Sequence, residues 1–180
     1  MLYPYFLGGS KMIKFTSATE DENKNASGGI AGDQTGLEVR TREAYNHELG
    51  WRIFRHPDKA VAKTIAANAK IMANNENIGY DQGERNTVYE IVKENNWDIN
   101  SINKPCECDC SSLVRTCVAS ALKQDVYNFS TANEADKLME LGFKEIYDIP
   151  LEDLLTGDIL CTKTKGHTEI CSCGKDGSSD

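Results

Sequence analysis

Two side chains in this sequence have the types and the setting that nucleophilic catalysis needs. Cys110 lies in the run Asp-Cys-Ser-Ser-Leu, directly before apolar residues with helical spacing. The first N–H groups of a helix and its macrodipole favour negative charge, so a thiol at this position is a candidate nucleophile. His167 follows a glycine and opens a strand-like run, and histidine exchanges protons near neutral pH. The pattern predicts a Cys–His pair.

Structural roles for the same residues remain alternatives at this stage. Free cysteine is among the most buried residue types, so Cys110 could be a core thiol. A histidine satisfied in the core or at the surface is the alternative for His167. Cys117 falls on the apolar stripe of the same helix and is expected to be core.

Four of the seven cysteines form two Cys-x-Cys pairs, Cys106 with Cys108 and Cys171 with Cys173. The odd count and the absence of a secretory leader favour reduced thiols over a disulfide framework. Four thiolates could hold zinc, which makes a zinc-stapled binding module without catalysis the alternative function. Structural zinc sites normally contain a Cys-x-x-Cys knuckle, so we expect no metal and no cofactor.

The elements that must position Cys110 and His167 are helices followed by short antiparallel strands. Apolar periodicity predicts helices over 57–75, over 88–92 with an end before Trp97, from the Cys110 region to Leu122, and over 133–141. Residues 78–81 are expected to be a connector. Strand-like runs follow at 143–149, 158–162 and 167–171. The order predicts an α+β fold with the helices packed on a small antiparallel sheet.

The N-terminal part predicts a β-ribbon with a long loop. Residues 37–42 and 51–55 alternate in polarity, and the stretch 20–36 is rich in Gly, Asn, Ser and Asp. We therefore expect a tail over 1–11, an extension over 12–56, the catalytic domain over 57–173 and a linker-like tail over 174–180.

Three segments resemble the motifs of the NlpC/P60 and related phage amidase families. Residues 109–113, Asp-Cys-Ser-Ser-Leu, resemble the nucleophile motif of these papain-like enzymes. Residues 157–160, Gly-Asp-Ile-Leu, and 166–170, Gly-His-Thr-Glu-Ile, resemble their next two strands. Residues 78–80, Ile-Gly-Tyr, resemble the segment that supplies an active-site tyrosine. The segments occur in the family order and cover roughly residues 57–173.

The resemblance implies a papain-like fold and a cell-wall hydrolase, of the phage or prophage lysin kind, that cuts an amide or peptide bond of the peptidoglycan stem peptide. Cys110 would be the nucleophile and His167 its base. The family's third residue, which orients the histidine, normally follows about a dozen residues later, where this chain has Gly-Lys-Asp-Gly-Ser-Ser. Glu169 is the substitute we consider. The further residues to which we give a site-lining or substrate-binding role are Tyr80, Asp109, Ser111, Asp33 and Gln34. A cysteine protease or toxin acting on another peptide is a further alternative.

Composition narrows the partners of this 180-residue chain. Its net charge of −8 argues against a nucleic-acid binder, which normally carries a basic face. No stretch approaches the roughly 20 apolar residues of a membrane span. The first ten residues have no basic region and no cleavage site, so we expect synthesis in a bacterial cytoplasm without a signal peptide. We expect a monomer that reaches the wall after release.

Overall fold

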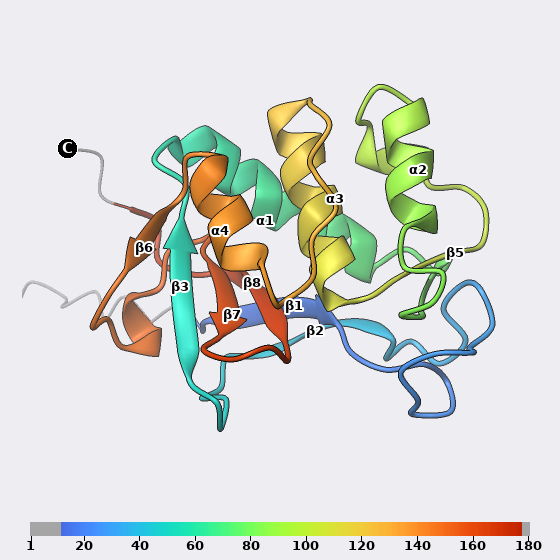
Figure 1. Ribbon diagram of the computed structural model, residues 1–180, viewed down its shortest axis with the longest axis horizontal. Helices are drawn as coiled ribbons and strands as arrows, with labels where there is room; N and C mark the ends of the chain where they lie inside the picture. Colours follow the sequence, from blue (N-terminus) through green and yellow to red (C-terminus); the bar gives the residue numbers. More distant parts are fainter. Residues whose placement is uncertain (1–11, 178–180) are drawn as a thin grey trace, which may run out of the picture.

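The computed structural model describes residues 12–177, so the predicted tail over 1–11 and residues 178–180 lie outside the described part. Six strands of the described residues form one sheet in the order β2-β1-β8-β7-β3-β6, and each neighbouring pair is antiparallel (Figure 1). Their bounds are β1 Lys14–Ala18, β2 Val39–Glu43, β3 Trp51–Arg55, β6 Lys144–Ile146, β7 Ile159–Thr162 and β8 Thr168–Cys173. The α+β class is confirmed.

The N-terminal segment is part of this sheet, which corrects the expected division at residue 56. Strand β1 pairs with β8 in the middle of the sheet, and β3 pairs with β7. Their alternating apolar residues explain this placement, because Phe15 and Ile53 share a buried cluster with Leu160 of β7 and Cys171 of β8. Residues 12–56 are therefore not an added ribbon. They supply three of the six strands on which the candidate site is built.

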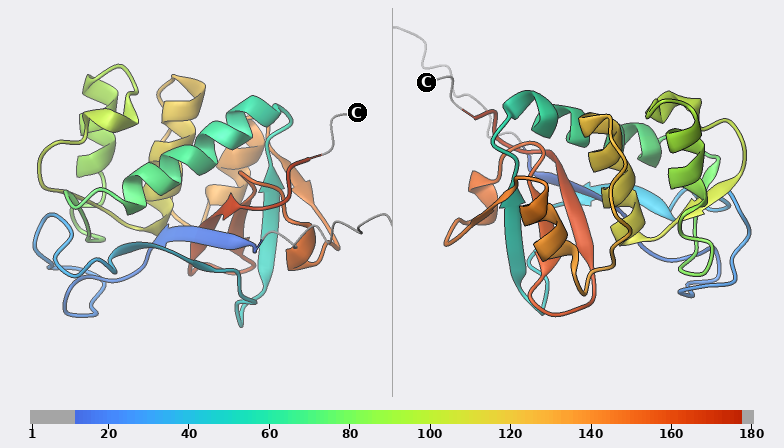
Figure 2. Two further views of the ribbon diagram at one scale, coloured as in Figure 1. Left: turned by 180° about the vertical axis from the view of Figure 1, so that it is seen from behind. Right: turned by 45° about the horizontal axis from the view of Figure 1, so that its top comes forward.

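Helices cover one face of the sheet (Figure 2). Helix α1, Lys59–Ala73, contacts α3, Cys110–Leu122, and both helices contact β8. Asp58 caps α1 by accepting from the N–H of Ala60 at 2.8 Å, so Pro57 precedes the cap rather than opening the helix. The remaining helices are α2 Thr87–Glu94, α4 Glu134–Glu140 and the 3₁₀ turns Ile99–Ser101 and Leu151–Asp153.

A second sheet of two parallel strands lies beside α2. It consists of β4, Ile78–Tyr80, and β5, Cys106–Cys108. The expected connector over 78–81 is thus a strand, and three residues are too few to show a strand period in the sequence. A Cβ on Gly79 would lie 2.3 Å from the Gly32 carbonyl oxygen. The long N-terminal loop therefore packs directly on β4, and glycine at 79 makes this close approach possible.

The C-terminal residues 174–177 pack against the body of the protein, which corrects the prediction of a linker for this part. The N–H of Lys175 donates to the Leu154 carbonyl at 2.8 Å, and the N–H of Thr156 donates to the Lys175 carbonyl at 3.1 Å. A sequence rich in Gly and Asp resembles a linker, but backbone hydrogen bonds to a neighbouring turn do not depend on apolar side chains.

The Gly-Asp segment before β7 has a structural explanation. Gly157 has φ +94°, and a Cβ there would lie 2.2 Å from the Ala62 carbonyl oxygen in α1. Asp158 accepts two hydrogen bonds from Arg55 at 2.7 Å and one from the Leu155 N–H at 2.8 Å. The contacts of Asp158 thus connect β3, β7 and the turn before β7. They explain the Gly-Asp segment without a catalytic role for Asp158.

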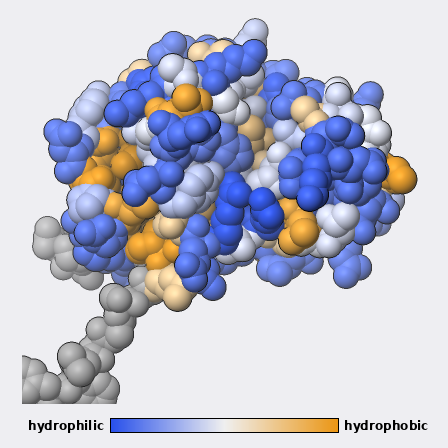
Figure 3. All heavy atoms as spheres, turned by 90° about the horizontal axis from the view of Figure 1, so that it is seen from below, coloured by the Kyte–Doolittle hydropathy of each residue, from blue (hydrophilic) through white to orange (hydrophobic). Residues whose placement is uncertain are grey.

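The buried cluster that contains Phe15, Ile53, Leu160 and Cys171 lies on the sheet face that the helices do not cover. Trp51, Tyr45 and Ile146 are only partly buried against it. In the view from below, hydrophobic residues gather in patches among hydrophilic ones (Figure 3). Within residues 12–177, no helix combines the length and the apolar character that crossing a membrane requires.

The buried carboxyl group of Glu38, at the end of the long N-terminal loop, makes the stability of the fold depend on pH. It is buried before β2, where Oε1 accepts from the Gln34 N–H at 3.2 Å and Oε2 has no hydrogen-bond partner among the described residues. Burial raises the pKa of Glu38 from 4.5 to about 7. The folded state therefore binds more protons than the unfolded state between these values, so its stability falls as pH rises through this range.

We expect Glu38→Gln to melt a few degrees above wild type at pH 8, and we expect this difference to shrink towards pH 5. Thermal unfolding followed by circular dichroism at both pH values measures the effect, with the exposed Glu43→Gln as control. An equal difference at both pH values would contradict the assignment.

Candidate active site

Cys110 is the first residue of α3, and Asp109 is its N-cap. The Asp109 carboxylate accepts from the Ser112 N–H at 2.7 Å, while the Ser112 hydroxyl accepts from the Asp109 N–H at 2.8 Å. This capping box fixes the start of the helix and hence the position of the thiol. Asp109 also pairs with Arg85 at 3.0 Å, and the Ser111 hydroxyl accepts from Arg85 at 2.8 Å. The two polar neighbours of Cys110 are therefore held in place.

The thiol lies at a polar hollow of about 340 Å³. Its lining residues are Gln82, Arg85, Asp109, Cys110, Ser111, Ser130, Thr131, Lys165 and Gly166. They come from the loop after β4, the start of α3, the loop before α4 and the turn between β7 and β8. These segments are far apart in the sequence, and only the fold brings them together around Cys110.

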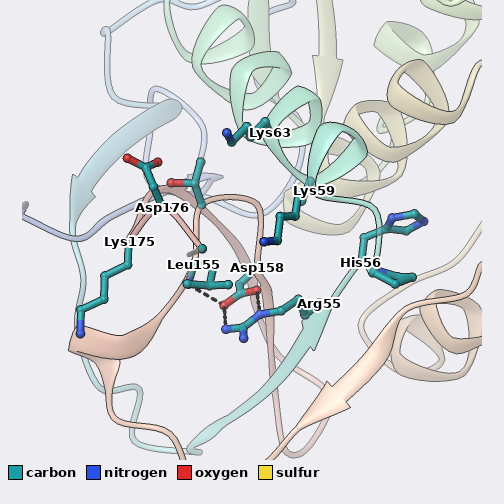
Figure 4. A pocket seen from close by; sticks show the side chains of 12 residues that line it. Arg55, His56, Lys59, Lys63, Leu155, Asp158, Lys175 and Asp176 are labelled. Atoms are coloured by element: carbon teal, nitrogen blue, oxygen red, sulfur yellow. Dashed lines mark hydrogen bonds and ion pairs between the residues drawn. The ribbon is translucent and has the colours of Figure 1, made fainter. Parts of the chain in front are cut away.

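A smaller hollow of about 120 Å³ lies elsewhere, between the start of α1 and residues 155–158 and 175–177 (Figure 4). Arg55 is paired with Asp158 there, so its charge is already compensated. The hollow contains no cysteine. The chemistry suggested by the sequence belongs to the hollow at Cys110.

Burial decides the state of the Cys110 thiol. It raises the pKa of the thiol, and the nearby carboxylates of Asp109 and Glu134 raise it further. The backbone N–H groups of Thr168 and Ser111 lower this pKa, but by less. The expected thiolate stabilisation by the helix start is thus present and outweighed by desolvation. A reaction that uses this sulfur as a nucleophile would therefore need a base to remove the thiol proton.

Tyr80 lies near this centre. Its side chain is buried, and burial together with the nearby Cys110 raises its pKa to about 12. Its hydroxyl accepts from Gln82 Nε2 at 3.1 Å, and Gln82 lines the hollow. The structure therefore brings Tyr80, Asp109, Ser111 and Cys110 together.

His167 precedes β8 and is held by a buried carboxylate. Its Nε2 lies 3.0 Å from Glu169 Oε1, and Glu169 also pairs with Arg42 and accepts from the Tyr45 hydroxyl at 3.0 Å. Burial acts to raise the pKa of Glu169, but the hydrogen bond from His167 and the charges of His167 and Arg42 outweigh it, so this pKa lies below its ordinary value. An ionised Glu169 favours a proton on Nε2. Arg42 Nη2 also lies 3.3 Å from this nitrogen and can only donate, which favours the other tautomer, so the contacts do not select one of the two.

The imidazole Nδ1 is the second ring nitrogen of His167. It has no hydrogen-bond partner in the described part of the chain. The backbone N–H of Thr168, the residue next to His167, lies close enough to the Cys110 thiol to lower its pKa. Within residues 12–177 no hydrogen bond joins the thiol to the imidazole. The two side chains lie on opposite faces of the sheet. Thr168 turns towards Glu134 and the helices, whereas His167 and Glu169 lie on the face of Tyr45 and Trp51. His167 is not among the residues that line the hollow, so the structure does not bring the imidazole to the Cys110 thiol.

Asp33 and Gln34 are not brought to the hollow. Asp33 Oδ1 accepts from the N–H groups of Thr35 and Gly36, and Gln34 Nε2 donates to the Ala31 and Gly32 carbonyls. Both side chains hold the backbone of their own loop, which is the ordinary function of such residues in turns.

The four cysteines of the zinc alternative lie apart. Cys106 and Cys108 are buried in β5 within the main core, whereas Cys171 belongs to the apolar cluster on the other sheet face. Residues 12–177 contain no group of three or more His, Cys, Asp or Glu that could hold a metal ion. The arrangement gives no support to a zinc-stapled module.

Several residues of this site have no signal in the sequence. Arg42 and Tyr45 are 127 and 124 positions from Glu169. Glu134 and Arg85 fall in segments that show only helix and turn patterns. Their sequence neighbours carry no chemical motif, and only tertiary contacts identify them.

The fold and the site together define an α+β domain with a buried thiol at a helix start and a histidine–carboxylate pair on the adjoining strand. A family model described as endolysin-like domain matches residues 15–178. The chain therefore belongs to the endolysin-like domain family. Neither the curated proteins nor the solved structures include a match to this chain.

Proposed function

We propose that this protein is a peptidoglycan hydrolase of the papain-like, NlpC/P60 type that acts as a phage or prophage lysin. One observation carries the proposal: Cys110 opens helix α3 at a polar hollow, and the strand that follows this hollow carries a histidine–carboxylate pair, His167 with Glu169. A thiol, a histidine and an orienting carboxylate are the groups that acyl transfer by a cysteine enzyme requires. The proposal therefore requires the His167 imidazole to turn towards the hollow when the substrate is bound, because His167 does not line the hollow in this structure. Membership of the endolysin-like domain family supports the cell wall as the target.

The chemistry follows from the protonation states of the site. His167 Nδ1 takes the proton from Sγ while the sulfur attacks the scissile carbonyl carbon, and N–H groups at the start of α3 stabilise the oxyanion. The imidazolium returns this proton to the leaving amine as the C–N bond breaks and a thioester forms. Water, activated by His167, then hydrolyses the thioester and regenerates the thiol. Glu169 holds Nε2 in the structure, on the sheet face of Tyr45 and Trp51, so the proposed step requires the imidazole to turn before Nδ1 can reach the sulfur.

The hollow fits an extended peptide better than an apolar ligand. Gln82, Ser130 and Thr131 offer hydrogen-bonding groups at its rim, and Lys165 adds a positive charge. Peptide amides and the carboxylates of a stem peptide match such groups. We propose the stem peptide as the part of peptidoglycan that is bound.

Mass spectrometry of material released from purified sacculi tests this function. We expect soluble muropeptides with one new amino group and one new carboxyl group per cut. A lactyl carboxyl freed from alanine would identify an amidase, and a cut within the stem would identify an endopeptidase. If a panel of sacculi releases nothing while an unrelated polypeptide is cleaved at a rate that depends on Cys110, the wall assignment is wrong and the protein is a peptidase of another kind.

A further inference from the structure

Glu134 is a buried carboxyl group that the proposed reaction does not use. It is the first residue of α4, and its side chain is fully buried against β8. Oε1 lies 2.7 Å from the Thr168 hydroxyl, and Oε2 is buried with no hydrogen-bond partner among residues 12–177. A buried charged carboxylate with an unpartnered oxygen is costly, so the ionisation state of Glu134 needs an explanation.

The number of protons available at the Thr168 hydroxyl explains the ionisation state of Glu134. The Thr168 hydroxyl lies 3.0 Å from the Leu160 carbonyl oxygen as well as near Glu134 Oε1. A hydroxyl has one proton to donate, whereas a carbonyl and a carboxylate can only accept. Both contacts are satisfied when Thr168 donates to Leu160 and a protonated Glu134 donates to the Thr168 oxygen. The geometry therefore fits a neutral Glu134.

We propose that neutral Glu134 is a positioning residue for Cys110, because it fixes Thr168 against the thiol and keeps a second negative charge away from the sulfur. Helix α3 packs on β8, and the Thr168 N–H lies close enough to the Cys110 thiol to lower its pKa. A hydrogen bond that holds Thr168 from α4 therefore also holds the strand segment that begins at His167. This inference depends on the proposed function only in taking Cys110 as the reactive thiol.

The charges around Glu134 give the direction of the pH effect. Burial raises the pKa of Glu134 to about 8, with Asp109 acting in the same direction and the Thr168 hydrogen bond and Arg85 acting against it. Cys110 and Cys161 also face Glu134, because its charge raises the pKa of both thiols. As pH rises through about 8, Glu134 ionises and the Cys110 thiolate becomes harder to form.

Alkylation of Cys110 by iodoacetamide from pH 6 to pH 10 tests the proposal without any wall substrate. The rate is read by mass spectrometry of the Cys110 peptide in wild type, Glu134→Gln and the exposed control Glu140→Gln. Glutamine can donate to Thr168 as a protonated glutamate does, but it cannot ionise. Above pH 8 we expect Glu134→Gln to react up to about tenfold faster than wild type, since one unit in the thiol pKa changes the thiolate fraction about tenfold. Glu140→Gln should follow wild type.

Identical alkylation profiles for wild type and Glu134→Gln above pH 8 would overturn the proposal. A loss of reactivity in Glu134→Gln near pH 6 would also overturn it, because it would show that the ionised form of Glu134 is needed.

Thr168→Val is the second variant, for use if Glu134→Gln does not fold. We expect Cys110 to react several-fold more slowly in Thr168→Val. Thr168→Ser keeps the hydroxyl, so we expect it to react at the wild-type rate. An unchanged rate in Thr168→Val would equally contradict the proposal. Normal alkylation profiles with no release from sacculi would count against the proposed function alone.

Discussion

Replacing Cys110 by serine is expected to reduce the release of muropeptides by more than about a thousandfold while leaving the fold intact. A serine hydroxyl gives up its proton far less readily than a thiol, and this site is already buried enough to raise the pKa of the thiol itself. The serine hydroxyl can occupy the same position at the start of α3, so we expect a loss of stability of only about 1 kcal/mol. Release of soluble fragments from sacculi measures activity, and thermal unfolding measures stability.

Cys173→Ser is the matched control for this substitution. Cys173 ends β8 and is the one described cysteine that is only partly buried. The Cys173→Ser variant makes the same change of sulfur to oxygen, but outside the hollow. We therefore expect its activity to stay near that of wild type. A Cys110→Ser protein that clears sacculi at nearly the wild-type rate would remove Cys110 from the mechanism.

His167→Ala is expected to lower turnover by about a hundred- to ten-thousand-fold, the range that removal of a general base produces. Burial raises the pKa of the Cys110 thiol, so the proposed mechanism needs the His167 imidazole to take the proton from the sulfur. The substitution also removes the hydrogen bond to Glu169, whose carboxylate keeps its contacts with Arg42 and Tyr45. The measurement is the rate of muropeptide release at saturating substrate, compared between His167→Ala and wild type.

His56→Ala is the control for this experiment. His56 precedes α1, lines the smaller hollow and packs on Phe143, with 5.0 Å between the ring centroids. We expect it to cost little activity. His47 is unsuitable as a control, because its ring stacks on that of His167 at 6.3 Å. Equal losses in His56→Ala and His167→Ala would place the base elsewhere.

The helix that carries Cys110 illustrates what local sequence can determine. Its apolar stripe and the Asp-Cys-Ser-Ser run predict a helix with a capped start, and α3 begins at Cys110 with Asp109 as its cap. Capping depends on a side chain and an N–H three residues apart, so the signal lies within one short segment. For the same reason the alternation in residues 37–42 and 51–55 correctly indicated strands.

The sequence by itself therefore determined the α+β class, the helix start at the thiol and the strand at His167. Only the tertiary structure decided that β1 and β3 belong to the same sheet as β8, and that Arg42, Tyr45 and Glu169 meet around His167. It also decided that burial outweighs the helix start in setting the pKa of Cys110. The physical reason is range: capping and periodicity act over a few residues, whereas strand pairing, desolvation and the contacts of a buried carboxyl depend on segments more than a hundred residues apart.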